Sequence, residues 1–162
     1  MIVVADASPL IFLGKLRRLD LISATVRGAL LIPESVRREL LPHTLDPAEK
    51  EYLEAFLKGC AIETVRQPRR FASSMSAADN DGLTLAIRCR ADWLLCDDRI
   101  TRLAAETEGV RTLGTLGILL RALRGKVLTP AAATELLDRL VRSHGLRISI
   151  ELYQQTLSEI AK

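Results

Sequence analysis

Short apolar runs alternate with longer amphipathic segments along the chain. Five of these runs predict strands, at 2–5, 29–32, 60–65, 93–96 and 110–112. The first run, Ile2 to Ala5, is continuously apolar instead of alternating, which is typical of a strand buried on both faces of a parallel sheet. The pattern therefore predicts a sheet with a buried centre.

The segments between the runs have helical spacing and helix-start signals. Ser8-Pro9 combines a cap residue with proline at the first helical position, and Asp46-Pro47 repeats that signal. Gln67 to Ser74 is polar and irregular, which predicts a loop. Helices are expected at about 8–16, 19–26, 33–41, 46–57, 76–90, 98–109, 114–124, 130–143 and 149–161.

Strands that alternate with helices favour an α/β sandwich around a mostly parallel sheet. The chain has 162 residues, a length that suits one domain. It contains no internal repeat, low-complexity tract or dividing linker. We therefore expect a single domain over 1–162, with the last two helices, 130–162, as a C-terminal helical extension.

Composition narrows the class of protein. Apolar residues make up 48% and charged residues 27%, which fits a globular protein and excludes disorder. Three cysteines without a CxxC pair argue against a disulfide scaffold and favour the cytoplasm. The longest apolar run, 114–120, stops at Arg121 and is too short for a membrane span. The net charge is only +3, but 18 of the 23 basic residues are arginines, whose guanidinium groups fork onto phosphates.

Acidic residues follow two of the expected strands. Asp6 ends the first, and Asp97-Asp98 ends the one that starts at Trp93. Ligands of open α/β sheets bind beyond these strand ends, although an acid there can also cap the next helix. Ser8 already supplies a cap after Asp6. For Asp97 capping is an equal alternative, which would leave Asp98 free to point elsewhere.

Two further acids lie on expected helices, where helical phase places them. Glu39 borders the face that carries Val36 and Leu40, and Asp79 shares a face with Leu83, whereas Asp81 points away from Leu83. Asp79 also completes a Ser-x-x-Asp capping box with Ser76, an equally good explanation taken alone. Carboxylates on a helix face that borders the core need partners, because burying an unpaired charge costs free energy.

Four acids could meet at one end of the sheet: Asp6, Glu39, Asp79 and Asp98. Crowded carboxylates repel one another, and a divalent cation removes that repulsion. Oxygen ligands suit Mg²⁺ or Mn²⁺. Such ions polarise phosphoryl oxygens and activate water, so the natural substrate is a phosphodiester.

Several blocks of the sequence resemble a PIN domain, over nearly the whole chain. They are Asp6-x-Ser8-Pro9-Leu10-Ile11, Pro33-Glu-Ser-Val-Arg-Arg-Glu39-Leu40, Asp97-Asp98-Arg99, Gly114-Thr-Leu-Gly-Ile-Leu-Leu-Arg-Ala122 and His144-Gly-Leu-Arg-Ile-Ser149. The resemblance is to a VapC-like prokaryotic branch that carries the Gly-Thr-Leu-Gly segment.

This resemblance implies a three-layer Rossmann-like fold of about five parallel strands and a metal-dependent ribonuclease site. It places the family acids on Asp6, Glu39, Asp79 and either Asp97 or Asp98, with Asp98 favoured. The branch usually has Gly-Glu where this chain has Ala78-Asp79, and aspartate is one carbon shorter. Ser8 matches a hydroxyl residue that supports the first acid, and Asp97 and Asp81 are further supporting candidates.

The same resemblance implies partners. Proteins of this kind cut RNA, often as toxins paired with an antitoxin protein, and usually form homodimers. Candidate phosphate contacts are Arg99, Arg102, Arg37 and Arg38, which flank the acids but also suit a solvated helix surface. The departure at Ala78-Asp79 and the capping alternatives leave a second hypothesis open, a catalytically inactive PIN-fold module that binds RNA or protein.

Overall fold

The computed structural model describes all 162 residues and contains one five-stranded sheet, every strand pair of which is parallel. The strands are β1 (Ile2–Ala5), β2 (Ala29–Pro33), β3 (Ala61–Glu63), β4 (Trp93–Leu95) and β5 (Thr112–Leu113). Their order is β3-β2-β1-β4-β5, so β1 lies at the centre. The expected α/β fold with a parallel sheet flanked by helices is confirmed.

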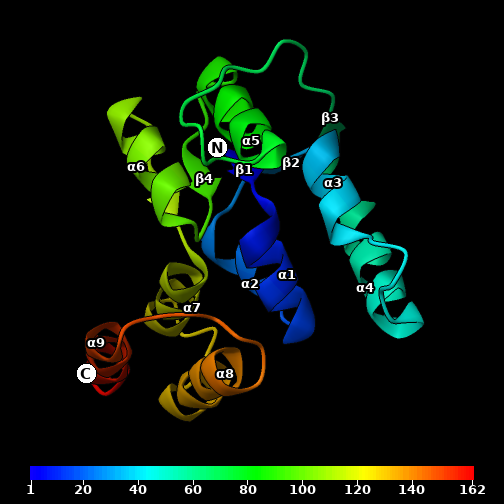
Figure 1. Ribbon diagram of the computed structural model, residues 1–162. Coiled ribbons are helices and arrows are strands. Elements are labelled where there is room, and N and C mark those ends of the chain that lie inside the picture. Colours follow the sequence, from blue (N-terminus) through cyan, green and yellow to red (C-terminus); the bar gives the residue numbers. More distant parts are fainter.

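Nine helices surround the sheet (Figure 1). They are α1 (Ala7–Lys15), α2 (Asp20–Thr25), α3 (Glu34–Leu40), α4 (Pro47–Leu57), α5 (Ala77–Arg88), α6 (Arg99–Thr107), α7 (Thr115–Arg124), α8 (Pro130–Arg142) and α9 (Ile150–Ile160). Several expected bounds are shifted by one or two residues. Helix α1 begins at Ala7 instead of Ser8, and the last strand lies at 112–113 instead of 110–112.

Two apolar clusters make the layers. Val4 and Leu94 point from the sheet towards Leu83 of α5 and Ala105 of α6. Val3 and the other alternate strand positions face a larger cluster with α1, α2, α3, α4, α7 and α8. Because successive strand residues point to opposite faces, a run that is apolar at every position must be covered on both. The continuous apolar strands thus account for the three-layer arrangement.

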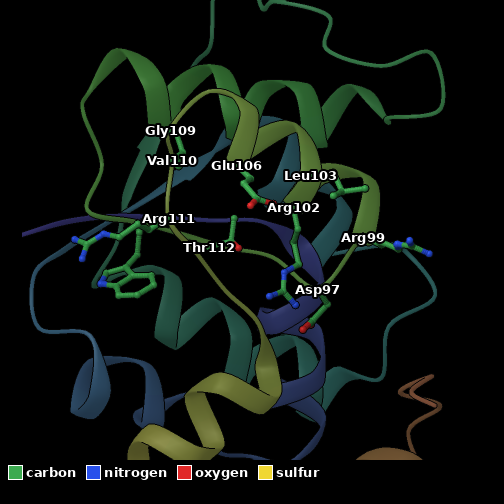
Figure 2. A pocket seen from close by; sticks show the side chains of 10 residues that line it. Asp97, Arg99, Arg102, Leu103, Glu106, Gly109, Val110, Arg111 and Thr112 are labelled. Atoms are coloured by element: carbon green, nitrogen blue, oxygen red, sulfur yellow. The ribbon is translucent and has the colours of Figure 1, made fainter. Parts of the chain in front are cut away.

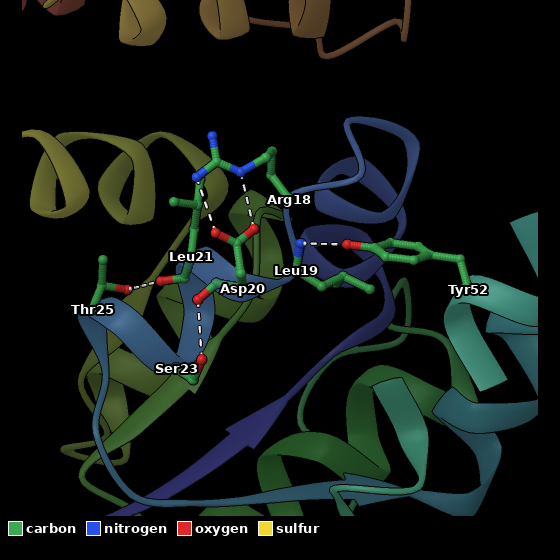
Figure 3. Close-up of polar contacts among 7 residues, drawn as sticks. All are labelled: Arg18, Leu19, Asp20, Leu21, Ser23, Thr25 and Tyr52. Carbon is green, nitrogen blue, oxygen red and sulfur yellow. Dashed lines mark hydrogen bonds and ion pairs between the residues drawn. The ribbon is translucent and has the colours of Figure 1, made fainter. Parts of the chain in front are cut away.

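Polar contacts hold the turn between α1 and α2, which lies beside the larger apolar cluster (Figure 3). Arg18 forks onto the carboxylate of Asp20 at 2.9 and 3.0 Å. The Leu19 amide donates to the hydroxyl of Tyr52 at 3.2 Å, which ties α4 to this turn. Arg17 adopts a positive φ of 58°, and its guanidinium lies 4.9 Å from the ring centre of Tyr52.

The polar stretch before α5 is a loop, as expected, but its end is firmly anchored. The side chain of Asn80, buried on α5, accepts a hydrogen bond from the Phe71 amide at 3.0 Å. Its amide group donates to the carbonyl oxygens of Met75 and Ser76 at 3.3 and 2.9 Å. One side chain therefore holds the backbone that leads into the acidic start of α5.

We expect Asn80→Ala to lower the free energy of unfolding by about 1–3 kcal/mol, since it leaves buried backbone groups without partners. Urea unfolding measures this loss, and amide hydrogen exchange at Phe71 should accelerate. Ser73→Ala, at an exposed position of the same loop, is the matched control and should change neither. An Asn80→Ala protein as stable as that control would show that the loop is anchored elsewhere.

Candidate active site

The carboxyl ends of β1 and β4 adjoin at the centre of the sheet. Ala5 is in register with Leu95, and the Asp6 amide donates to the Leu95 carbonyl oxygen at 2.9 Å. Chain order reverses here, since β2 and β3 extend the sheet on one side of β1 and β4 and β5 on the other. Such a switch point leaves a crevice in which parallel α/β sheets bind ligands.

Asp6 lies at this switch point, directly after β1, and is only 3% exposed. Burial raises its pKa to about 8, with further contributions from the charge of Asp79, a side-chain hydrogen bond to Asp79, and the charge of Glu39. A hydrogen bond from the Ala7 amide opposes this shift. Without a cation beside it, Asp6 is therefore largely protonated at neutral pH.

Asp79, half-buried at the start of α5, has two contacts. Its Oδ2 accepts from the Ser76 amide at 3.0 Å while its own amide donates to Ser76 Oγ at 3.1 Å, which forms the capping box. It also lies within hydrogen-bond reach of Asp6. Asp79 can therefore complete the capping box and lie beside Asp6 at the same time, so the two roles that the sequence suggested for it do not exclude each other.

Glu39 approaches the same place from α3 but is more open than its helical phase indicated. Its side chain is exposed, and partial burial together with the charge of Asp79 raises its pKa. The two helices are joined directly, because Ser35 of α3 donates to the carboxylate of Asp81 on α5 at 2.5 Å. Asp81 therefore helps to hold Glu39 and Asp79 at a fixed separation.

The roles expected of Asp97 and Asp98 as helix caps are reversed. Asp98 is the N-cap of α6, and its Oδ2 accepts from the amide and the hydroxyl of Thr101 at 2.8 and 3.1 Å. Asp97 instead turns towards Thr115, whose amide and hydroxyl donate to its two carboxylate oxygens at 2.7 and 2.6 Å. The cap falls to Asp98 because it is the residue immediately before the first helical position.

Gly114 and Thr115 also form the site, a role that the Gly-Thr-Leu-Gly segment does not specify on its own. A Cβ on Gly114 would lie 2.8 Å from Asp97 Oδ1 and 3.3 Å from the Cys96 carbonyl oxygen, so only glycine fits there without a shift. The Gly-Thr pair of the Gly-Thr-Leu-Gly segment thus orients Asp97. Burial raises the pKa of Asp97, whereas the Thr115 hydrogen bonds and Arg102 lower it.

The candidate phosphate contacts differ in their surroundings. Arg37 is bound by its own helix, with Nε and Nη2 donating to Glu34 at 2.8 and 2.6 Å, and Arg38 is exposed beside it. Arg102 extends from α6 towards Asp97, whereas Arg99 points away from it (Figure 2). Arg102 thus lies at the strand ends without a carboxylate salt bridge, and on α3 Arg37 is paired whereas Arg38 contacts only the Glu34 carbonyl oxygen at 3.5 Å.

Ser8 does not cap a helix, contrary to expectation. Helix α1 begins one residue earlier, Asp6 takes the N-cap position, and no side chain accepts a capping hydrogen bond there. The reason is that the strand leads into the helix with a single intervening residue. Asp6 is thereby free to face the crevice, and Ser8 lies in the first turn of α1.

The chemistry of this donor set fits a divalent cation. No three His, Cys, Asp or Glu side chains are already arranged around a common point. The charges of Asp79 and Glu39 nevertheless raise the pKa of Asp6, and the charge of Asp79 raises the pKa of Glu39, so the three carboxyl groups lie near one another. Hard oxygen donors under mutual repulsion are what Mg²⁺ and Mn²⁺ bind.

The fold and this acidic crevice define a nuclease-type PIN domain. A family model described as PIN domain matches residues 2–162, so the chain belongs to the PIN domain family. No curated protein matches it.

A solved structure supports the same fold. The chain is similar to a PilT N-terminus domain protein from the hyperthermophilic archaeon Sulfolobus solfataricus, with a TM-score of 0.54 and 13% sequence identity. The match covers 73% of this chain and 90% of that one. None of the helices of the structure is long and apolar enough to cross a lipid bilayer.

The raised pKa of Asp6 makes stability depend on pH. Its pKa is about 8 when folded and near 3.8 when unfolded, so between these values the folded protein holds a proton that the unfolded chain has released. In EDTA, stability should therefore fall as pH rises from about 4 to 8, by up to about 1.4 kcal/mol per pH unit.

Asp6→Asn should remove most of this slope and melt at a higher temperature than the wild type at pH 8 in EDTA. Mn²⁺ should raise the melting temperature of the wild type and leave that of the variant nearly unchanged. Differential scanning calorimetry at several pH values measures both effects. Equal slopes for the two proteins would mean that Asp6 is ionised and already compensated in the free protein.

Proposed function

We propose that this protein is a metal-dependent endoribonuclease that hydrolyses RNA phosphodiester bonds. The observation that carries the proposal is that Asp6 lies buried at the switch point of a PIN fold, with Asp79 and Glu39 near enough for their charges to raise its pKa. Membership of the PIN family supports nuclease chemistry, and the arginine-rich composition supports a polyanionic substrate.

Asp6, Glu39 and Asp79 would hold Mg²⁺ or Mn²⁺, with a fourth carboxylate from the Asp97-Asp98 pair. A divalent ion held there polarises a phosphoryl oxygen and the attacking water. Asp6 would supply a ligand from its buried position at the end of β1. Glu39 approaches from the open side, and the Ser35–Asp81 contact sets its distance from Asp79.

We also propose a partner, a compartment and an oligomeric state for this protein. An antitoxin protein would be the partner if the chain is the toxin of a pair, and the cytoplasm would be its compartment. A homodimer remains our proposal, but α7 is covered by α2, α8 and α9 within the chain. The exposed Ile150 and Leu152 of α9, 73% and 42% exposed, are the apolar residues left near the C-terminus for such a contact.

The first test is cleavage of structured RNAs in Mn²⁺ or Mg²⁺, with EDTA as the metal-free arm. We expect cleavage that EDTA abolishes and that Glu39→Gln lowers by roughly a hundredfold or more, the scale set by loss of one electrostatic catalytic group. Glu51→Gln makes the same chemical change at an exposed position of α4 and should cleave like the wild type. If RNA is bound but never cut, the inactive binding module is the better description.

The second test separates Asp97 from Asp98. Asparagine caps helices as well as aspartate does, so Asp98→Asn keeps the Thr101 contact and removes only charge. Because Oδ1 of Asp98 accepts no hydrogen bond and both oxygens of Asp97 are engaged by Thr115, we expect Asp98→Asn to weaken Mn²⁺ binding more than Asp97→Asn. Isothermal titration decides, and the opposite order would assign the fourth ligand to Asp97.

A further inference from the structure

A trough runs along the edge strand β5, beside the acidic crevice. Its larger part is a hollow of about 650 Å³ between α6 and β5 (Figure 2). A smaller hollow of about 260 Å³ continues it between the start of α7 and the segment before α9. The two hollows share Asp97, Arg102 and Thr112, so the trough passes the carboxyl end of β4.

The trough carries an excess of positive charge. Arg99, Arg102 and Arg111 line the larger hollow and Arg147 the smaller one, and the carboxylates in their linings are those of Asp97 and Glu106; Arg111 also pairs with Asp92 outside the lining. Asp97 has both oxygens engaged by Thr115. Arg102 forms no salt bridge with a carboxylate, in contrast to Arg37 on the other side of the crevice, which is neutralised by Glu34. The trough along β5 therefore offers unpaired positive charge to a polyanion.

At one end of the trough, the planar guanidinium of Arg111 is held in place by its neighbours. The guanidinium of Arg111 lies 4.7 Å from the ring centre of Trp93 and 3.9 Å from a carboxylate oxygen of Asp92. Arg121 packs on the same ring at 5.1 Å. An arginine held in this way has lost part of its side-chain freedom already, and its exposed guanidinium plane is a surface on which RNA bases stack.

We propose that this trough binds a single strand of RNA next to the bond that is cut, with a phosphate on Arg102 and a base stacked on Arg111. The proposal rests on the proposed function, because it takes RNA to be the substrate. The larger hollow has the volume of an ordinary small-ligand site, enough for a nucleotide unit. The flat guanidinium plane favours a nucleic acid over an acidic peptide, which offers charge but no base.

Trp93 is the only tryptophan of the chain, so its fluorescence reports on this trough directly. The experiment titrates a short single-stranded RNA into the full-length protein in Ca²⁺, which suppresses cleavage, over a series of salt concentrations. We expect a change in tryptophan emission on binding and an affinity that falls linearly on a log–log salt plot, by about 0.7 per phosphate contact for single strands.

Four variants test the residues. Arg102→Ala should flatten the salt slope by about 0.7. Arg111→Ala should weaken binding about tenfold or more, the scale of one stacked base. Arg111→Lys should keep the salt slope and lose affinity, because it keeps the charge but not the plane. Arg27→Ala, at an exposed arginine just before β2 at the opposite end of the sheet, is the control and should bind like the wild type. Circular dichroism confirms that each variant is folded.

The proposal is overturned if RNA leaves the emission of Trp93 unchanged and the trough variants bind like Arg27→Ala. It is also overturned if Arg37→Ala costs more affinity than Arg102→Ala, or if polyglutamate competes as strongly as RNA. Cleavage by the same proteins in Mn²⁺ is scored separately. If the trough variants lose RNA binding but the wild type cuts no RNA, the nuclease proposal is rejected and the trough proposal stands. If the wild type cuts RNA and the trough variants keep its KM, the nuclease proposal stands and the trough proposal is rejected.

Discussion

The structure depends on a carboxyl group buried at the end of its central strand. Asp6 is only 3% exposed and lies near Asp79, and its burial together with the charge of Asp79 holds its pKa near 8. A folded chain that places such a group at its sheet centre is less stable at neutral pH than one with a neutral residue there. The arrangement is compatible with stability only if a proton or a cation compensates the charge, and a cation does so while leaving both carboxylates ionised.

The neighbouring elements keep this unfavourable arrangement from relaxing. Carboxylates that repel each other would separate if their helices could move, but the capping box fixes Asp79 to the first turn of α5. The hydrogen bond from Ser35 to Asp81 then ties α5 to α3. On the other side of β1, Thr115 fixes Asp97 by two hydrogen bonds. Rigid positioning of charged ligands is what a precise metal site requires.

How much of this could be predicted from the sequence depends on whether the signal is local. The apolar run at β1, the Asp46-Pro47 start of α4 and the capping box at Ser76 are local patterns, and the structure has all three. That Asp98 caps α6 follows from its position before the helix, but the orientation of Asp97 is not local, because its partner Thr115 lies 18 residues away. The exposure of Glu39 likewise depends on what covers α3, which helical phase does not specify.

The two sides of the acidic crevice differ in a way that composition alone conceals. A chain with 18 arginines and a net charge of +3 has no obvious direction of approach for a polyanion. On the α3 side, however, Arg37 is neutralised within its own helix, three residues from its partner. On the α6 side Arg102 points towards the strand ends without a carboxylate salt bridge (Figure 2). Pairing within a helix thus decides which of the arginines that flank the acids keep their charge available for a polyanion, and it removes Arg37 but not Arg102.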